Sequence, residues 1–328
     1  MTHLVLTGGL VKPAIADAVL GKVCAVPVRV ALPDGQLQGG LLAPEAAIAR
    51  VQFYAAALGL TGQSATLAGR PGEACVVYGE AGIADAGLAE MVMQDFGLIA
   101  AERVRARLGA LRVAAASRLR AGLGAGRGVR QGTGEVRPEG RAVPHAGFFA
   151  LEEHLLRFRR FDGTLSPVLR REVFVAGDAV TVLPYDPVRD RVLLVEQMRM
   201  GPYGRGDPLP WQLEAIAGRI DPGEMPEDCA RREAVEEAAL VLGRLEKVAE
   251  YYPTPGAVTE YLYSYVAICE LPDGAAGVFG AAEEAEDIRG HLVGFDALMA
   301  LVAGGEVANA PLILTALWLQ RERPRLRG

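Results

Sequence analysis

The sequence contains few of the residues that stabilise secreted or zinc-binding proteins. Its 328 residues include four cysteines and four histidines, with no CxxC pair and no histidine cluster. Such scattered cysteines predict buried, reduced thiols and neither a disulfide framework nor a zinc site. The cysteines are Cys24, Cys75, Cys229 and Cys269.

Long apolar runs are also missing from the sequence. No run approaches about eighteen apolar residues, the length of a membrane-spanning helix. The N-terminal segment has no basic stretch in front of its first apolar residues, as a signal peptide would. We therefore expect a cytoplasmic protein that makes no membrane contact.

An excess of positive charge is absent too. Lysine and arginine total 34 against 40 aspartates and glutamates, which leaves a net charge of −6 and argues against nucleic-acid binding. One stretch, residues 86–123, is helical in pattern and basic, but no aromatic residue that could stack on a base lies among its arginines. We interpret it as a solvated connecting helix, and a nucleic-acid or membrane surface is the alternative. The arginines are Arg103, Arg105, Arg107, Arg112, Arg118 and Arg120.

The chain is long enough for two domains of roughly 150 residues each. Residues 1–85 alternate short apolar runs with glycine and proline, which predicts a small α+β domain. Residues 86–140 are expected to form the basic helix and a glycine-rich linker. Residues 141–328 form the third part, with strand patterns in 171–199, 210–220 and 260–271 and helix patterns in 295–305 and 308–323.

The most informative stretch lies in this third part and reads GRIDPGEMPEDCARREAVEEAAL, from Gly218 to Leu240. Its glutamates Glu233, Glu236 and Glu237 have i, i+3 and i+4 spacing, so they project from nearly one face of a helix. Crowded carboxylates favour a hard divalent cation such as Mg²⁺, which takes oxygen ligands and acts on phosphates. The alternative is a solvated acidic helix face.

The stretch resembles the Nudix box, G-x5-E-x7-R-E-U-x-E-E-x-G-U, in which U is a bulky apolar residue. Gly218, Glu224, Arg232 and the three glutamates occupy the matching positions in register. Two positions depart from the pattern: Ala234 is small, and Ala239 replaces the last glycine. If that glycine forms a left-handed turn, an alanine there should lower the free energy of unfolding by about 1 kcal/mol.

The resemblance implies a metal site built from this helix and the residue before Gly218. Glu233 and Glu237 would be metal ligands, and Glu236 a further ligand or a coupled catalytic carboxylate. The backbone carbonyl of Ala217 would complete the set around Mg²⁺, with Mn²⁺ as a possible substitute.

Other box residues and a later loop would support the reaction. By resemblance, Arg232 and Glu224 orient the ligands, as metal sites require. The general base is expected in the segment 280–293, where Glu284 and Glu286 match catalytic-loop acids of similar enzymes. An acidic loop without function is the competing interpretation, and His291 is an alternative base.

Outside the box the sequence resembles the ADP-ribose pyrophosphatase branch of the family. Pro255, Gly256 and Glu260 match substrate-site positions of that branch, and Arg171 and Arg199 match arginines that hold the diphosphate or the terminal ribose. The resemblance implies hydrolysis of ADP-ribose to AMP and ribose 5-phosphate. The alternatives are another nucleoside diphosphate derivative (GDP-mannose, FAD or NADH) and a non-catalytic nucleotide sensor.

The resemblance also implies an architecture and an assembly. We expect an α/β fold: a Nudix α/β/α sandwich preceded by a small α+β domain and a basic linker helix. Similar enzymes form homodimers, and residues 144–163 would be the swapped arm. The whole layout resembles tellurite-resistance-associated Nudix proteins, whose N-terminal half is gamma-glutamylcyclotransferase-like. The motifs LTGGL (6–10) and FYAAALG (53–59) depart from the active pattern, which implies a degenerate domain.

Overall fold

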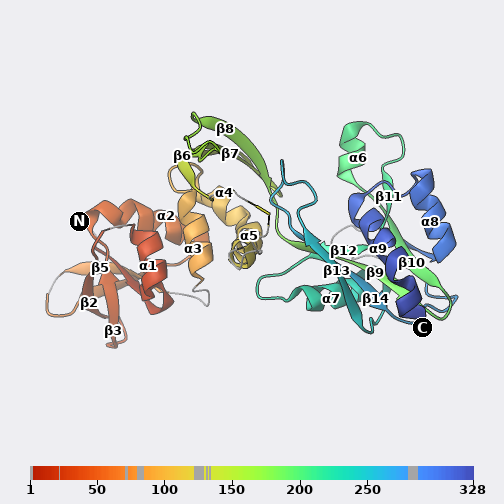
Figure 1. Cartoon of the computed structure of the whole chain (residues 1–328). Coiled ribbons are helices and arrows are strands. Elements are labelled where there is room, and N and C mark those ends of the chain that lie inside the picture. Colours follow the sequence, from red (N-terminus) through yellow and green to blue (C-terminus); the bar gives the residue numbers. More distant parts are fainter. Residues whose placement is uncertain are drawn as a thin grey trace. The chain divides into compact units, whose positions relative to one another are not determined.

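The computed structural model describes residues 3–21, 23–70, 73–79, 85–121, 129–130, 132, 134–279 and 287–328. The chain divides into two compact units, Met1–Val175 and Ala176–Gly328 (Figure 1). Every helix in the described ranges is too short or too polar to cross a membrane.

The first unit begins with a five-stranded closed barrel of order β1-β3-β2-β4-β5. Successive side chains of β1 point to opposite faces and belong to two hydrophobic cores. Val5 packs inside the barrel, whereas Leu4 and Leu6 pack against helices. The predicted small α+β domain is confirmed. Its strands are β1 (His3–Thr7), β2 (Val26–Ala31), β3 (Leu37–Leu42), β4 (Gln63–Leu67) and β5 (Ala74–Tyr78). Its helices are η1 (Gly8–Val11), α1 (Pro13–Leu20), η2 (Glu45–Ala47) and α2 (Ile48–Leu58).

The basic stretch forms helices whose arginines are partly directed inward. It contains α3 (Ala86–Gln94), α4 (Ala101–Ala106) and α5 (Leu108–Ala121). The Arg107 side chain is only 8% exposed and its Nη1 lies 3.7 Å from Oδ2 of the buried Asp95, while Arg118 donates to Gln94 Oε1 at 2.8 Å. The interpretation as a solvated helix is therefore wrong for Arg107, which forms an internal ion pair.

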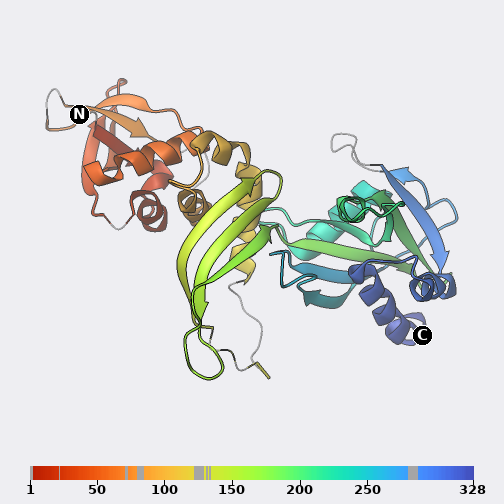
Figure 2. The same cartoon turned by 90° about the horizontal axis from the view of Figure 1, so that it is seen from above.

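A three-stranded antiparallel sheet, ordered β6-β7-β8, completes the first unit (Figure 2). Its strands are β6 (Val136–Ala146), β7 (Ala150–Phe158) and β8 (Leu169–Val175). Arg141 on β6 donates to Asp95 Oδ1 at 2.8 Å and to Glu152 Oε1 on β7 at 2.6 Å. Asp95 and Glu152 are both buried, and breaking such a buried pair typically costs about 3–5 kcal/mol.

This network explains where the first unit ends. The predicted third part begins at residue 141, whereas the compact unit extends to Val175, because the ion pairs fasten β6 and β7 to the helix ending at Gln94. Strand β6 also begins at Val136, inside the segment predicted to be a glycine-rich linker.

The second unit contains an eight-stranded mixed sheet of order β13-β14-β9-β10-β16-β15, with β11 paired to β10 and β12 paired to β9. Its strands are β9 (Ala179–Asp186), β10 (Arg191–Met198), β11 (Trp211–Glu214), β12 (Ile216–Arg219), β13 (Leu245–Tyr251), β14 (Leu262–Ile268), β15 (Val278–Phe279) and β16 (Ile288–Gly294). Its helices are α6 (Met200–Arg205), α7 (Pro226–Ala238), α8 (Phe295–Gly304) and α9 (Ala310–Arg327).

Helices cover this sheet on both faces (Figure 1). Val180 and Val182 of β9 pack toward α7, while Leu183 and Tyr185 of the same strand pack toward α8 and α9. All eight residues of β9 are buried, as expected for a strand covered on both faces. The predicted α/β/α sandwich is confirmed.

Helix α7 ends in a left-handed turn at Ala239, which has φ 51° and ψ 33°. The N–H groups of Ala239 and Leu240 donate to the carbonyls of Val235 and Ala234, so the turn closes the helix. The expectation that position 239 needs a left-handed conformation is confirmed, and an L-residue is strained there.

Replacing Ala239 by glycine should therefore stabilise the protein. We expect Ala239→Gly to raise the free energy of unfolding by about 1 kcal/mol, because glycine adopts positive φ without steric cost. Urea unfolding followed by circular dichroism measures this change. Ala238→Gly, one residue earlier and inside the helix, is the control, and its free energy of unfolding should fall by about 1 kcal/mol. Equal changes in both variants would contradict the prediction.

Candidate active site

Helix α7 packs an apolar face against the sheet, so its charged residues project from its remaining faces. The helix begins with Pro226 at its first position and acidic residues in its first turn, both favourable at a helix N-terminus. Cys229, Ala230 and Ala234 are fully buried against the sheet. The small Ala234, unusual for the box, fills a fully buried position in this stripe.

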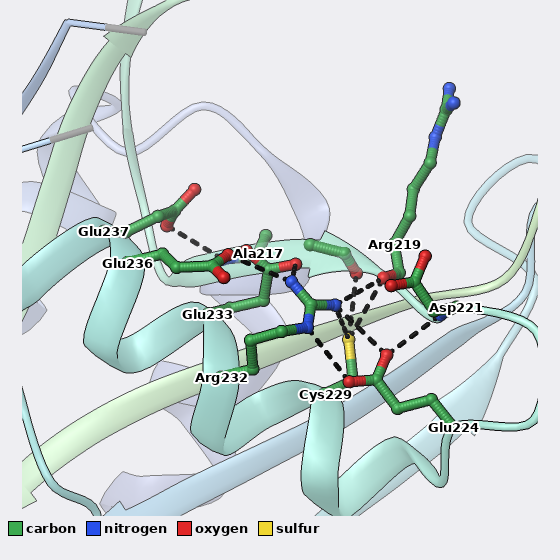
Figure 3. Close-up of polar contacts among 10 residues, drawn as sticks. Ala217, Arg219, Asp221, Glu224, Cys229, Arg232, Glu233, Glu236 and Glu237 are labelled. Carbon is green, nitrogen blue, oxygen red and sulfur yellow. Dashed lines mark hydrogen bonds and ion pairs between the residues drawn. The ribbon is translucent and has the colours of Figure 1, made fainter. Parts of the chain in front are cut away.

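The guanidinium of Arg232 lies at the centre of the polar residues on α7 (Figure 3). Its Nε and Nη2 donate to the two oxygens of Glu224 at 3.0 and 3.1 Å. Its Nη1 donates to Glu233 at 2.6 Å and to Glu236 at 3.0 Å. Its Nη2 also donates to the Arg219 carbonyl at 3.0 Å, which ties the helix to the end of β12.

These contacts shift the pKa values of Glu224 and Arg232. Burial opposes the charged form of Glu224, but hydrogen bonds from Arg232 and from the Asp221 amide bring the pKa of its carboxyl below the usual value. The hydrogen bond to Glu224 likewise raises the pKa of Arg232, despite partial burial. One cation therefore offsets part of the charge of three neighbouring carboxylates.

Two box carboxylates reach consecutive residues of β12. A Cβ atom on Gly218 would lie 1.8 Å from the Cδ and Oε1 atoms of Glu233, so only glycine leaves room for that carboxylate. Glu237, which is 3% exposed, accepts a hydrogen bond from the Ala217 amide at 3.2 Å. Glu237 and Glu233 therefore lie beside the consecutive residues Ala217 and Gly218.

The Ala217 carbonyl points to the same side. Ala217 is the partner of Thr181 in the antiparallel β12–β9 pair, and in such a ladder the N–H and C=O of one residue face the same way. Because the N–H reaches Glu237, the carbonyl also faces away from β9. The role of the Ala217 carbonyl as a metal ligand stays a prediction.

This donor set suits a hard divalent cation. In the described ranges, no three Asp, Glu, His or Cys side chains converge closely enough to hold an ion as placed, and Arg232 occupies oxygens of Glu233 and Glu236. The carboxylates of Glu233 and Glu237 nevertheless lie beside consecutive residues of β12, and together with the Ala217 carbonyl they form an all-oxygen donor set of the kind such cations prefer. The residues present therefore fit a divalent metal.

A second group of charged residues lies at the ends of β10 and β11. Arg199 follows β10, and its Nε donates to Glu214 of β11 at 2.7 Å. Burial raises the pKa of the Glu214 carboxyl even though Arg199 lies beside it. Burial also raises the pKa of Glu260, against the nearby charges of Arg219 and Arg199. The structure therefore brings the predicted residues Arg199 and Glu260 within electrostatic range of each other.

Other predicted residues lie elsewhere. Pro255 and Gly256 are exposed in the loop between β13 and β14. Arg171 is exposed on β8 and belongs to the first unit, so the second unit does not bring it together with the box. Glu284 and Glu286 lie outside the described residues.

His291 and Cys229 have structural surroundings. His291 Nε2 lies 2.7 Å from Glu196 Oε2, and its cross-strand partner Leu194 belongs to the core under α8 and α9, so His291 is on the sheet face opposite α7. Cys229 is buried, as predicted, and its Sγ also accepts from Arg232 Nη2 at 3.3 Å.

Comparison with known proteins agrees with the geometry of the box. The family described as NUDIX domain matches residues 175–314. The chain is 39% identical to the "ADP-ribose pyrophosphatase" of Escherichia coli (strain K12) over 197 residues, which are 60% of this chain and 93% of that protein. The chain belongs to the Nudix family.

Other similar proteins include a second enzyme class of the Nudix family. A "GDP-mannose pyrophosphatase" of Enterobacter sp. (strain 638) is 32% identical over 151 residues, 46% of this chain and 78% of that protein. The solved structure titled "Crystal structure of ADP compounds hydrolase" aligns with a TM-score of 0.46 and 20% identity, covering 62% of this chain and 100% of that one.

The E. coli match extends beyond the second unit. It spans 197 residues of this chain, whereas residues 176–328 number 153, so at least 44 matched residues precede Ala176. The region that this Nudix relative shares therefore includes residues of the first unit.

Sequence reasoning missed Glu214 as a site residue. It did not single out this glutamate because its proximity to Arg199 arises from strand pairing, with Val195 opposite Glu214. The sequence feature that could have identified Glu214 is its position three residues before Ala217, in the strand that leads into the Nudix box.

Glycine at position 218 should be required for activity more than for folding. We expect Gly218→Ala to lower kcat/KM about 100-fold, because the added Cβ displaces the Glu233 carboxylate, and small misplacements can have effects of this size. Steady-state hydrolysis and thermal unfolding should be measured together. Gly201→Ala is the control, since no atom lies within 4 Å of its added Cβ. Full activity of Gly218→Ala would show that Glu233 is not needed at that place.

Proposed function

We propose that the protein hydrolyses the diphosphate of ADP-ribose to AMP and ribose 5-phosphate, using Mg²⁺, with Mn²⁺ as a possible substitute. The observation that carries this proposal is the 39% identity to the E. coli ADP-ribose pyrophosphatase over 93% of that protein. The positions of Glu237 and Glu233 beside the consecutive residues Ala217 and Gly218 support it.

The residues of the Nudix box would have different roles in the reaction. A divalent cation held by Glu233, Glu237 and the Ala217 carbonyl supplies positive charge opposite the diphosphate oxygens. Arg232 fixes Glu233 and Glu236 through Nη1, so these carboxylates keep their places when the substrate arrives. Glu224 in turn fixes Arg232 through two hydrogen bonds.

Two further roles are proposed from the family resemblance. Glu284 or Glu286 would take the proton from the attacking water as the general base. Arg199 would hold the diphosphate or the terminal ribose together with Pro255, Gly256 and Glu260. A guanidinium suits this role because its planar fork matches oxygen pairs.

The alternatives are less well supported. The relative named GDP-mannose pyrophosphatase is less similar to this chain, at 32% identity over 46% of it. A non-catalytic sensor would not need Glu233, Glu236 and Glu237 all present on one helix, and all three are present. FAD and NADH share the diphosphate, so they remain substrates to compare.

The decisive test is hydrolysis of ADP-ribose by the wild type and by Glu237→Gln. We expect wild type with Mg²⁺ to release AMP and to stop when EDTA is added. Glu237→Gln should lose at least about 100-fold in kcat, because it removes a buried negative charge from the proposed cation site. Liquid chromatography of the nucleotides measures both rates.

The control uses an acidic residue of the same helix that points into solvent. Asp228→Asn, exposed in the first turn of α7, should retain wild-type activity. Retained activity in Glu237→Gln would overturn the site assignment. Faster turnover of GDP-mannose, FAD or NADH than of ADP-ribose would replace the proposed substrate.

We also propose that the protein acts as a homodimer in which residues 144–163 form a swapped arm that carries contacts to the second copy. Glu152 lies on the face of β7 that is directed toward the partly buried Arg141. Leu155 and Phe174 lie on the opposite face and are 38% and 51% exposed. Exposed apolar residues on one face of a sheet are typical of interaction surfaces.

A charge on this face should separate the dimer. Sedimentation velocity of the wild type is expected to give one species of about twice the chain mass of 34.7 kDa, and Phe174→Asp should shift it toward the monomer because a buried unpaired charge is costly. Val188→Asp, at a position 83% exposed in the second unit, is the control and should stay dimeric. A monomeric wild type would contradict the proposal.

The remaining proposals concern the N-terminal region and the location. Residues 1–85 would be a degenerate domain with a structural or regulatory role, 86–140 its connection, and 141–328 the Nudix domain. The prediction of buried thiols holds for Cys75 and Cys229, whereas Cys269 is partly buried and Cys24 is exposed, so it is wrong for Cys24. We propose a cytoplasmic location because the cysteines are scattered in the sequence and form no CxxC pair.

A further inference from the structure

One buried amide in the second unit has a donor group without a protein partner. Gln197 of β10 is 7% exposed, and within the described ranges its Nε2 makes no hydrogen bond. Buried polar groups nearly always have partners, and an unpaired one in a folded protein calls for a reason. A ligand that supplies the missing acceptor is such a reason.

Strand pairing places this amide on the catalytic face of the sheet. Val195, two residues before Gln197 on β10, packs in the core under α7, so Gln197 lies on the same face. The β10–β11 register pairs Val195 with Glu214 and Gln197 with Gln212. Directly paired residues share a face, so Gln197 and Glu214 both lie on the side of the sheet that α7 covers.

Gln197 and Glu214 form a row of polar side chains on this face, and Arg199 extends that row. Arg199 is two residues beyond Gln197, and its Nε donates to Glu214 at 2.7 Å. Its side chain is 39% exposed, and within the described ranges its two terminal nitrogens make no hydrogen bond. Gln197 and Arg199 thus offer donors, and Glu214 offers an acceptor.

The row adjoins the proposed metal-binding residues. Glu214 ends β11, and Ala217 follows three residues later in β12. Three residues of extended chain span about 10 Å, so the row lies within about 10 Å of Ala217, the residue whose amide reaches Glu237. Glu260 lies within electrostatic range of Arg199.

The charge balance of the row indicates which part of the substrate it faces. Arg199 and Glu214 neutralise each other, and Gln197 carries no charge. A neutral row with both donors and acceptors matches vicinal hydroxyl groups, which donate and accept, better than a diphosphate, which only accepts and would be repelled by Glu214.

We propose that Gln197, Arg199 and Glu214 form a subsite that binds the hydroxyl groups of the terminal sugar of a nucleoside diphosphate sugar. This subsite rests on the proposed function. Gln197 donates through Nε2 to a sugar hydroxyl oxygen, and Glu214 accepts from a hydroxyl while it orients Arg199. The unpaired amide is tolerated in the free protein because the substrate completes its hydrogen bonding.

The test is Gln197→Met, which keeps the length of the side chain and removes its polar groups. We expect the KM for ADP-ribose to rise about tenfold, because a sugar hydroxyl then lacks its partner. The inhibition constant of AMP, which has no terminal sugar, should stay unchanged. The urea unfolding midpoint should stay equal or rise, because an unpaired buried amide has been removed.

Gln212→Met is the matched control. Gln212 is the direct cross-strand partner of Gln197, but its Nε2 already donates to the Trp211 carbonyl at 3.3 Å. We expect its KM for ADP-ribose to match the wild type. An equal rise in both variants would assign the effect to general disturbance of the strand pair and overturn the subsite.

Three further outcomes would overturn the proposal. An unchanged KM in Gln197→Met would show that the amide does not contact the substrate. A parallel rise in the AMP inhibition constant would move the contact to the nucleotide half. A lowered unfolding midpoint would assign Gln197 a structural role. Failure of the proposed function is recognised separately, because the wild type itself would then not hydrolyse ADP-ribose.

Discussion

The guanidinium of Arg232 holds together side chains whose charges would otherwise drive them apart. Two carboxylates about 4 Å apart repel by roughly 4 kcal/mol near a protein surface. Arg232 contacts Glu224, Glu233 and Glu236 at once and binds the Arg219 carbonyl. The fixed geometry of an arginine fork makes these simultaneous contacts possible, and a lysine amine could not reproduce it.

The fit between helix α7 and strand β12 depends on small residues on both sides. Ala230 and Ala234 are fully buried against the sheet, and Gly218 leaves the space that the Glu233 carboxylate occupies. Glu237 can then reach the Ala217 amide. The site is therefore set by the small residues between helix and sheet as much as by its charged groups.

Much of this arrangement could be predicted from the sequence because it is local. The spacing of Glu233, Glu236 and Glu237 fixes one helical face, and the left-handed turn at Ala239 follows from the position of the missing glycine. The sandwich was implied by the resemblance to the Nudix box, with which the strand and helix patterns of the second unit agree. Local periodicity alone was sufficient only for the helical face.

The features that could not be predicted depend on contacts between distant segments. Gln197 and Glu214 share a face only because β10 and β11 pair in one register. Arg107 appears as one of several basic residues in the sequence, yet it is buried next to Asp95. Strand β6 begins in a segment whose glycines suggested a linker. Sequence periodicity carries no information on such partners.

The ion pairs around Arg141 have a consequence for how the chain can be divided. Trimming the protein at residue 130, to resemble its shorter relatives, would delete Asp95 and the Gln94 carbonyl, both of which accept hydrogen bonds from Arg141. Strand β6 would then expose a guanidinium that the intact protein buries, and only Glu152 would remain to pair with it. The N-terminal region therefore supplies two of the acceptors of Arg141, and a shortened chain would have to replace them.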